Sequence, residues 1–149
     1  MNREIEFRGK RCADGVWVYG DYVAGDSCDV SFIFPCDITS LFCVGGRYEV
    51  YENTIGEFTG LVDKNGVKIF EGDIVRKRDL TFGLKFDGVV VYSSEIGCFR
   101  IHSENNGVTM RMGFEASDVY NDGQCTVPVK YDYEVIGNIY DNPELLSTK

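Results

Sequence analysis

The stretch TGLVDKNGVKIFEGDIVRKR, Thr59–Arg78, carries the strongest folding signals in the chain. Within it, Asn65 and Gly66 form a pair that readily adopts the positive backbone angles of a tight hairpin turn. Asp63 precedes this pair and can accept hydrogen bonds from backbone N–H groups as the chain enters the turn. The spacing therefore predicts a β-hairpin centred on Asn65 and Gly66.

The segment EGDIV, Glu71–Val75, predicts a second turn that leads into a buried strand. Gly72 relaxes the backbone and Asp73 can hydrogen-bond the turn. Neither G-x-x-x-x-G-K-[ST] nor G-x-G-x-x-G occurs here, so these glycines do not form a phosphate-binding loop. Asp63, Glu71 and Asp73 are an alternative cluster for a hard cation, but they lack the alternating oxygen ligands of calcium loops. The structural interpretation is favoured.

The rest of the chain alternates short β-rich runs with glycine turns. The runs are rich in β-branched and aromatic residues, and several alternate with period two. Asn-Gly, Asp-Gly and Gly-Gly pairs separate them, and the 17 glycines of the sequence suit this demand for turns. About nine strands at this spacing favour a barrel or a sandwich. The runs are IEFRG, VWVYGDYV, DVSFIF, RYEVYE, KIFEGDIVRK, GVVVY, CFRIH, VTMRM and YEVIGNIY.

Helix signals are scarce. The segment Phe114–Gly123 can form one short helical turn before a glycine stop. Near the end, Asn142 is a candidate N-cap and Pro143 occupies the first helical position, which predicts a short C-terminal helix. We expect Leu145 and Leu146 of this helix to pack back on the sheet.

Three blocks of the sequence carry a family resemblance: REIEFRGKR with GVWVYGD (residues 3–11 and 15–21), FTGLVDKNGVKIFEGDIV (residues 58–75) and YEVIGNIYDNPELL (residues 133–146). In this order they resemble the YopX family, whose members are small proteins encoded mostly by phages and prophages. The resemblance implies an all-β fold, a partly open small β-barrel of the Src-homology-3 type with extra N-terminal strands, and it is compatible with oligomers. It implies no enzyme activity, catalytic residue or cofactor. We therefore expect a single domain over residues 1–149, with a soft boundary near residues 53–58.

The charge balance disfavours nucleic-acid binding. The net charge is −9, from 24 acids and 15 bases, and nucleic-acid affinity depends largely on Lys and Arg displacing counterions. The charges are unevenly spread. Residues 12–63 contain nine acids and one base, whereas residues 76–85 contain four bases and one acid.

Four basic residues form the local positive cluster: Arg76, Lys77, Arg78 and Lys85. On a strand, Arg76 and Arg78 share one face and Lys77 points to the other, which weakens a convergent phosphate site. Charges at a strand end also discourage edge-to-edge aggregation. An acidic protein, or the acidic segment 12–63 of a neighbouring subunit, is a better counterpart than nucleic acid.

Trp17 and Tyr19 alternate with Val16 and Val18 in the segment GVWVYGDYV. Burial in the core or in an interface is the favoured interpretation, because aromatic side chains gain much from burial. If this face is exposed, it is the best candidate for an oligomer or partner contact.

Nucleophilic catalysis has little support in the sequence. His102 is the only histidine, and Cys98 lies four residues before it. On one strand these side chains share a face but lie about 13 Å apart, too far for a direct hydrogen bond. No G-x-S-x-G elbow occurs. A second cysteine approaching His102 in three dimensions remains an alternative.

Six cysteines without a C-x-x-C pair, and no signal peptide or membrane-length apolar run, suggest reduced thiols in a cytoplasmic protein. We expect no metal, no cofactor and no membrane contact. The expected function is that of a non-enzymatic phage-type accessory protein, a homo-oligomer that binds a host or phage protein. The alternatives are a nucleic-acid-associated regulator that uses residues 76–85, and an acidic mimic of nucleic acid that binds a host protein.

Overall fold

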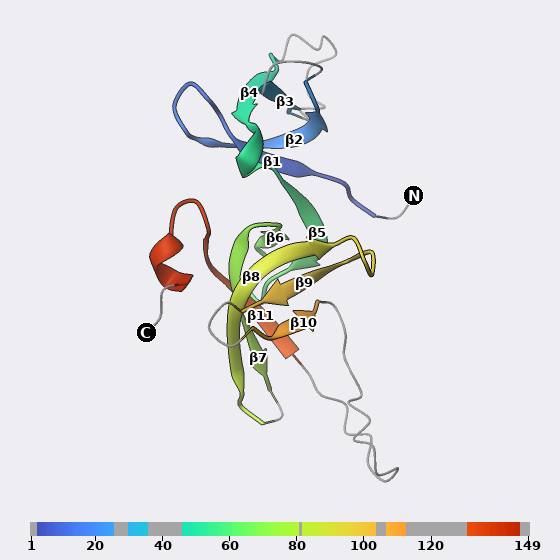
Figure 1. Ribbon diagram of the computed structural model, residues 1–149, viewed down its shortest axis with the longest axis vertical. Coiled ribbons are helices and arrows are strands. Elements are labelled where there is room, and N and C mark those ends of the chain that lie inside the picture. The colour runs from blue at the N-terminus through green and yellow to red at the C-terminus, as the bar shows by residue number, and fades with distance from the viewer. Residues whose placement is uncertain are drawn as a thin grey trace. The chain divides into compact units, whose positions relative to one another are not determined.

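The computed structural model describes residues 3–25, 30–35, 46–80, 82–103, 107–112 and 131–146. These residues form a mainly β protein with two antiparallel sheets (Figure 1). The expected all-β class is therefore confirmed. The family resemblance implies a partly open barrel. In the structure, the described strands form two open sheets that are not closed into a barrel.

The chain divides into two compact units, Met1–Gly60 and Leu61–Lys149. The division falls within a strand, just beyond the segment 53–58 where the sequence suggests a soft boundary. The elements that begin in the first unit are β1 (Phe7–Lys10), β2 (Trp17–Val23), β3 (Val30–Phe34), β4 (Tyr48–Tyr51), the 3-10 helix η1 (Glu52–Thr54) and β5 (Gly56–Val62). Those of the second unit are β6 (Lys68–Phe70), β7 (Asp73–Asp79), β8 (Lys85–Ser93), β9 (Cys98–His102), β10 (Thr109–Arg111), β11 (Tyr131–Asn138) and the 3-10 helix η2 (Pro143–Leu146).

Neighbouring strands in the first unit follow the order β4-β3-β2-β1-β5, with β6 next to β5 in the same sheet. One face of this sheet packs around Ile33 and Val50, which have no solvent exposure. An isolated bridge joins Arg11 to Val50, so the sheet curls until β4 meets the end of β1. At Gly20, which has φ +150°, a Cβ atom would lie 2.0 Å from the carbonyl oxygen of Phe34. A side chain at Gly20 therefore requires β3 to move.

The second unit has a five-stranded sheet in the order β10-β9-β8-β7-β11. Side chains alternate along each strand, so Val75 of β7 points into the core while Arg76 points away from it. Burial of one large aliphatic side chain contributes roughly 1.5–3 kcal/mol. The main stabilisation of this unit therefore comes from one cluster of buried side chains. Its members are Ile69, Val75, Val90, Phe99, Ile101 and Met112, and Leu61, Phe86, Tyr133 and Val135 pack against them.

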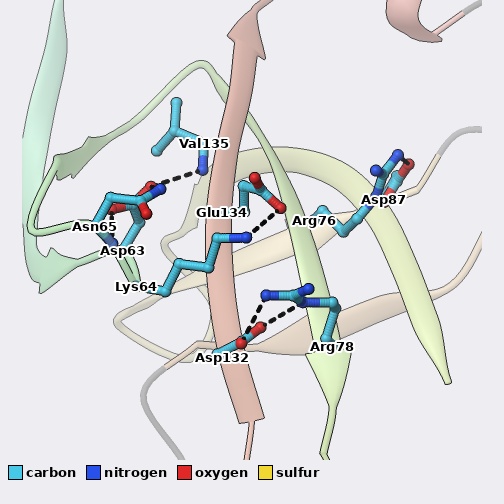
Figure 2. Close-up of polar contacts among 9 residues, drawn as sticks. All are labelled: Asp63, Lys64, Asn65, Arg76, Arg78, Asp87, Asp132, Glu134 and Val135. Carbon is cyan, nitrogen blue, oxygen red and sulfur yellow. Dashed lines mark hydrogen bonds and ion pairs between the residues drawn. The ribbon is translucent and has the colours of Figure 1, made fainter. Parts of the chain in front are cut away.

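The carboxylate of Asp63 joins the turn between β5 and β6 to β11 (Figure 2). It accepts backbone N–H bonds from Asn65 at 2.7 Å, Val67 at 2.9 Å and Val135 at 3.2 Å. Burial acts to raise the pKa of Asp63, but these backbone donors outweigh burial and lower the pKa below its ordinary value. Gly66 has φ +82° and its N–H donates to the Asp63 carbonyl at 3.0 Å. The predicted hairpin is confirmed.

The predicted second turn is also present. Gly72 joins β6 to β7 with φ +83°, and its N–H donates to the carbonyl of Val90 at 2.9 Å. The buried carboxylate of Asp73 accepts the backbone N–H of Phe70 at 2.8 Å. Asp63 and Asp73 thus both act within the fold, as the structural interpretation of this stretch predicts.

The C-terminal segment forms the predicted short helix, as the 3-10 helix η2. The N–H of Leu145 donates to the carbonyl of Asn142 at 3.1 Å. A Cβ atom on Gly137 of β11 would lie 2.8 Å from Cδ1 of Leu145, so Leu145 packs against the strand as expected. The other expected helical turn, Phe114–Gly123, lies outside the described residues.

Candidate functional site

The outer face of the five-stranded sheet carries most of its charges on β7, β8 and β11. Arg76 and Arg78 point to this face, and each lies between one residue of β8 and one of β11 in the strand register. Residues directly opposite each other in antiparallel strands share a face, so six side chains form two rows. We call them the charged face: Arg76 with Asp87 and Glu134, and Arg78 with Lys85 and Asp132.

Both arginines of the charged face are held by carboxylates of the same chain (Figure 2). Arg76 donates from Nε and Nη2 to the two oxygens of Asp87, at 2.8 and 2.7 Å. Arg78 makes the same paired contact with Asp132, at 2.8 Å for each bond. Hydrogen bonding raises the pKa of Arg76 beside Asp87 and the pKa of Arg78 beside Asp132. A phosphate that approached either guanidinium would have to compete with a bidentate carboxylate.

The turn between β5 and β6 also contributes to the charged face. Nζ of Lys64 lies 2.8 Å from Oε2 of Glu134 (Figure 2). The backbone N–H of Lys64 donates to the carbonyl of Tyr133 at 2.9 Å. The hydrogen bond from Lys64 lowers the pKa of Glu134, and the charges of Lys64, Arg78 and Arg76 act in the same direction. The turn and β11 are therefore joined by both backbone and side-chain contacts.

The two lysines singled out in the sequence take no part in the two arginine–carboxylate pairs. Lys77 points to the inner side of the sheet, is 7% exposed, and places Nζ 3.7 Å from the ring centroid of Tyr131. Lys85 is exposed at the start of β8, opposite Arg78. The predicted alternation of Arg76, Lys77 and Arg78 is confirmed, and these side chains do not converge on one anion.

The first unit presents a surface of a different kind. Trp17 and Tyr19 point to the face of β2 opposite the buried Ile33, and Tyr19 is 45% exposed. Strand register places Phe34 diagonally between Tyr19 and Val23, within reach of both. We define the aromatic face as the side chains of Trp17, Tyr19, Val23, Phe32, Phe34 and Tyr51.

Cations lie over two rings of the aromatic face. The guanidinium carbon of Arg8 lies 4.6 Å from the ring centroid of Trp17, and that of Arg47 lies 4.4 Å from the ring of Phe32. Such contacts are attractive because a ring face is electronegative. The sequence singled out Trp17 and Tyr19 but not Phe32 or Phe34. The alternation in DVSFIF could have indicated that Phe32 and Phe34 share one face of a strand. Only the strand register shows that this face lies beside that of Trp17 and Tyr19.

The residues considered for catalysis or metal binding do not form such a site in the described part of the chain. Cys98 and His102 share one face of β9, and Nδ1 of His102 lies 2.8 Å from Oγ1 of Thr109. Cys12 and Cys98, the two described cysteines, are free thiols. Among the described residues, no group of three His, Cys, Asp or Glu side chains is placed to hold a metal ion.

No helix within the described ranges is long and apolar enough to cross a membrane.

The fold is shared with a protein of known structure. The crystal structure of protein EF1440 from Enterococcus faecalis is similar to this chain with a TM-score of 0.50 and 23% sequence identity, over 98% of this chain and 100% of that one. No curated protein matches the sequence. The family model described as YopX protein matches residues 6–147, which is nearly the whole chain. The chain belongs to the YopX family.

Proposed function

We propose that this protein is a non-enzymatic accessory protein that acts through protein–protein contacts, with the aromatic face as its principal contact surface. One observation carries the proposal. Tyr19, Val23, Phe34 and Tyr51 share one face of the curled sheet and are each between 39% and 49% exposed. Adjacent exposed apolar side chains of this kind are typical of sites that bind other proteins.

The composition of the aromatic face suits an interface. Tyrosine and tryptophan are enriched among the residues that dominate binding energies, because each buries a large rigid surface with little loss of side-chain entropy. Charged residues of both signs accompany the rings on the same side of the sheet, namely Asp21, Glu49 and Arg47. A symmetric dimer needs a surface that is complementary to itself, and mixed charges around an apolar centre meet this requirement.

A second copy of the chain is therefore the favoured partner, and a host or phage protein is the other candidate within the same proposal. The phage or prophage origin and the cytoplasmic location expected from the sequence are part of this proposal as well. The charged face gives little support to the nucleic-acid alternative, because Asp87 and Asp132 already engage Arg76 and Arg78. No observation on the described residues specifically favours the acidic-mimic alternative.

The test is the mass of the protein in solution across a range of concentrations, measured by light scattering after size exclusion. We expect a dimer or larger oligomer whose dissociation constant rises about tenfold or more in Phe34→Ser. Val23→Ser, on the aromatic face, has a matched control in Val67→Ser, since Val23 and Val67 are 48% and 49% exposed. Only the first of this pair should weaken the oligomer.

A monomer at every concentration, together with no binding of purified candidate proteins that depends on Phe34, would contradict the proposal. Equal effects of Val23→Ser and Val67→Ser would also contradict it, because the contact would then not belong to the aromatic face.

A further inference from the structure

A groove of about 320 Å³ lies on the second unit, where β8, β9 and β10 run side by side. Strand register places Arg100 between Val91 and Arg111, and His102 between Val89 and Thr109. Through the alternation of side chains, Arg100, His102 and Thr109 are on the same side of the sheet as the charged face. The polar side chains that line the groove include Ser93, Ser94, Glu95, Arg100, His102 and Thr109.

Arg100 differs from the arginines of the charged face in its contacts. Among the described residues, its buried Nε has no hydrogen-bond partner, and its Nη2 lies 3.4 Å from the carbonyl oxygen of Thr109. Within the described ranges, no carboxylate lies at ion-pair distance from Arg100 or from Arg111. Arg76 and Arg78, by contrast, each make two bonds shorter than 3 Å to a carboxylate.

These contacts leave Arg100 in an unfavourable state that an anion can relieve. A buried N–H group without an acceptor is rare in folded proteins and costs free energy. Arg111 lies directly opposite Arg100, and like charges at opposite positions of two strands repel each other. An oxyanion in the groove beside Arg100 neutralises this repulsion, and the planar guanidinium fork matches its geometry.

We propose that this groove binds a small ligand through a single oxyanion group, a phosphate or a carboxylate, received by Arg100. Ser93 and Thr109 also line the groove, and Oγ1 of Thr109 lies 2.8 Å from Nδ1 of His102. Glu95 also lines the groove and repels further negative charge, which favours a small ligand over a nucleic-acid backbone. The site lies on the second unit and does not depend on the aromatic face.

The experiment is a titration of the ¹⁵N-labelled full chain with inorganic phosphate and, separately, with acetate, followed by amide and arginine Nε–H signals. We expect saturating shifts on β9 and at Arg100 Nε–H with one or both anions. Arg100→Gln should weaken binding about tenfold, the usual loss for one charge-assisted hydrogen-bonding group. Arg76→Gln is the control on the same sheet face and should leave the affinity within about twofold.

The dispersion of the amide spectrum reports whether Arg100→Gln disturbs the fold. If it does, two further variants still test the proposal. Arg111→Gln should weaken binding about threefold through the lost charge, and Glu95→Gln should strengthen it by a similar factor. Saturation by phosphate alone identifies a phosphate ligand, and saturation by acetate alone identifies a carboxylate ligand.

The proposal is overturned if neither anion shifts β9 at up to about 50 mM, a concentration above the dissociation constants of weak specific sites. Equal losses in Arg100→Gln and Arg76→Gln also overturn it, since binding would then be adventitious. A single-stranded oligonucleotide that binds more tightly than phosphate, with steep salt dependence, would assign the surface to nucleic acid instead.

Discussion

The aromatic face of the first unit and the charged face of the second unit are both the outward sides of antiparallel sheets. They differ in how fully their side chains are engaged by other residues of the same chain. The arginines of the charged face each make two hydrogen bonds to a cross-strand carboxylate. The aromatic face leaves Tyr19, Phe34 and Tyr51 between 39% and 49% exposed. Aromatic surface in water gains free energy from a partner, whereas a paired arginine gains little.

A local cluster of like charges in a sequence therefore does not by itself identify a binding surface. Residues 76–85 have a net charge of +3, yet the acids that neutralise Arg76 and Arg78 come from β8 and β11. Arg100 and Arg111, which make no ion pair with a carboxylate of the described chain, belong to β9 and β10 and stand in no basic run. Strand register decides which charges are available.

The largest effect is expected when the first sheet alone is disrupted. In Gly20→Ala the new Cβ would meet the carbonyl oxygen of Phe34 at 2.0 Å, so β3 must move and the aromatic face loses its register. We expect a loss of about 4 kcal/mol or more in the free energy of unfolding of the first unit. Urea unfolding followed by the fluorescence of Trp17, the only tryptophan, measures it.

Gly15→Ala is the matched control, because Gly15 also has a positive φ, +71°, but has no atom within 4 Å of the added Cβ. It should cost only about 1 kcal/mol, the backbone strain alone. Equal losses in the two variants would show that steric conflict with β3 is not the cause.

A substitution outside the charged face should lower the stability of the second unit. Asp63→Ala removes the acceptor of three backbone N–H groups, including that of Val135 on β11. We expect a loss of about 2–3 kcal/mol, because buried donors left without an acceptor keep their desolvation cost. Hydrogen exchange of the β11 amides measures the effect, which should be absent from β2 and β3. Uniform loss of protection over both units would contradict the local role of Asp63.

Acid should weaken the second unit through the same carboxylate. The pKa of Asp63 is lower in the folded chain than in the unfolded one, so its contribution is present above the unfolded pKa of about 3.9 and is lost as the pH falls through the folded value. The urea midpoint of the wild type should therefore fall below pH 4 more steeply than that of Asp63→Asn. Glu134→Gln removes a partly exposed carboxylate whose pKa is also lowered and should flatten the curve much less. Identical acid limbs in wild type and Asp63→Asn would refute this prediction.

The smallest effect is expected on the charged face itself. A double-mutant cycle of Arg76→Gln and Asp87→Asn should give a coupling energy of about 0.5 kcal/mol, because both side chains are more than a third exposed and solvent screens their pairing. The coupling should shrink further at high salt. A coupling of several kcal/mol would mean that the charged face is a major source of stability rather than a neutralised surface.

Local sequence signals predicted the turns and most strands well. Gly66 and Gly72 have the positive φ angles expected of them, and each β-rich run overlaps a strand. The strand β5 was not predicted, because Gly56 and Gly60 interrupt its β-branched pattern and its pairing with β1 bridges distant parts of the chain. The run KIFEGDIVRK forms two strands, since Gly72 turns the backbone between them.

The contact surfaces were less predictable than the strands. Trp17 and Tyr19 were identifiable from their alternation in one strand, but their neighbour Phe34 depends on the register of β2 with β3. The partner of Arg78, Asp132, is 54 residues away along the chain. No local pattern encodes such pairing, because it arises only when separate strands hydrogen-bond in one register.

The pairing of β7 with β11 also has a consequence for the newly made chain. During synthesis, β7 leaves the ribosome about fifty residues before β11, as the separation of Arg78 and Asp132 indicates. Until β11 arrives, β7 is an open sheet edge that carries Val75 and a row of unpaired backbone groups, which is a template for aggregation. The charge of Arg78, whose partner Asp132 is on β11, then repels a second nascent chain at that edge. In the finished protein, Asp132 neutralises it.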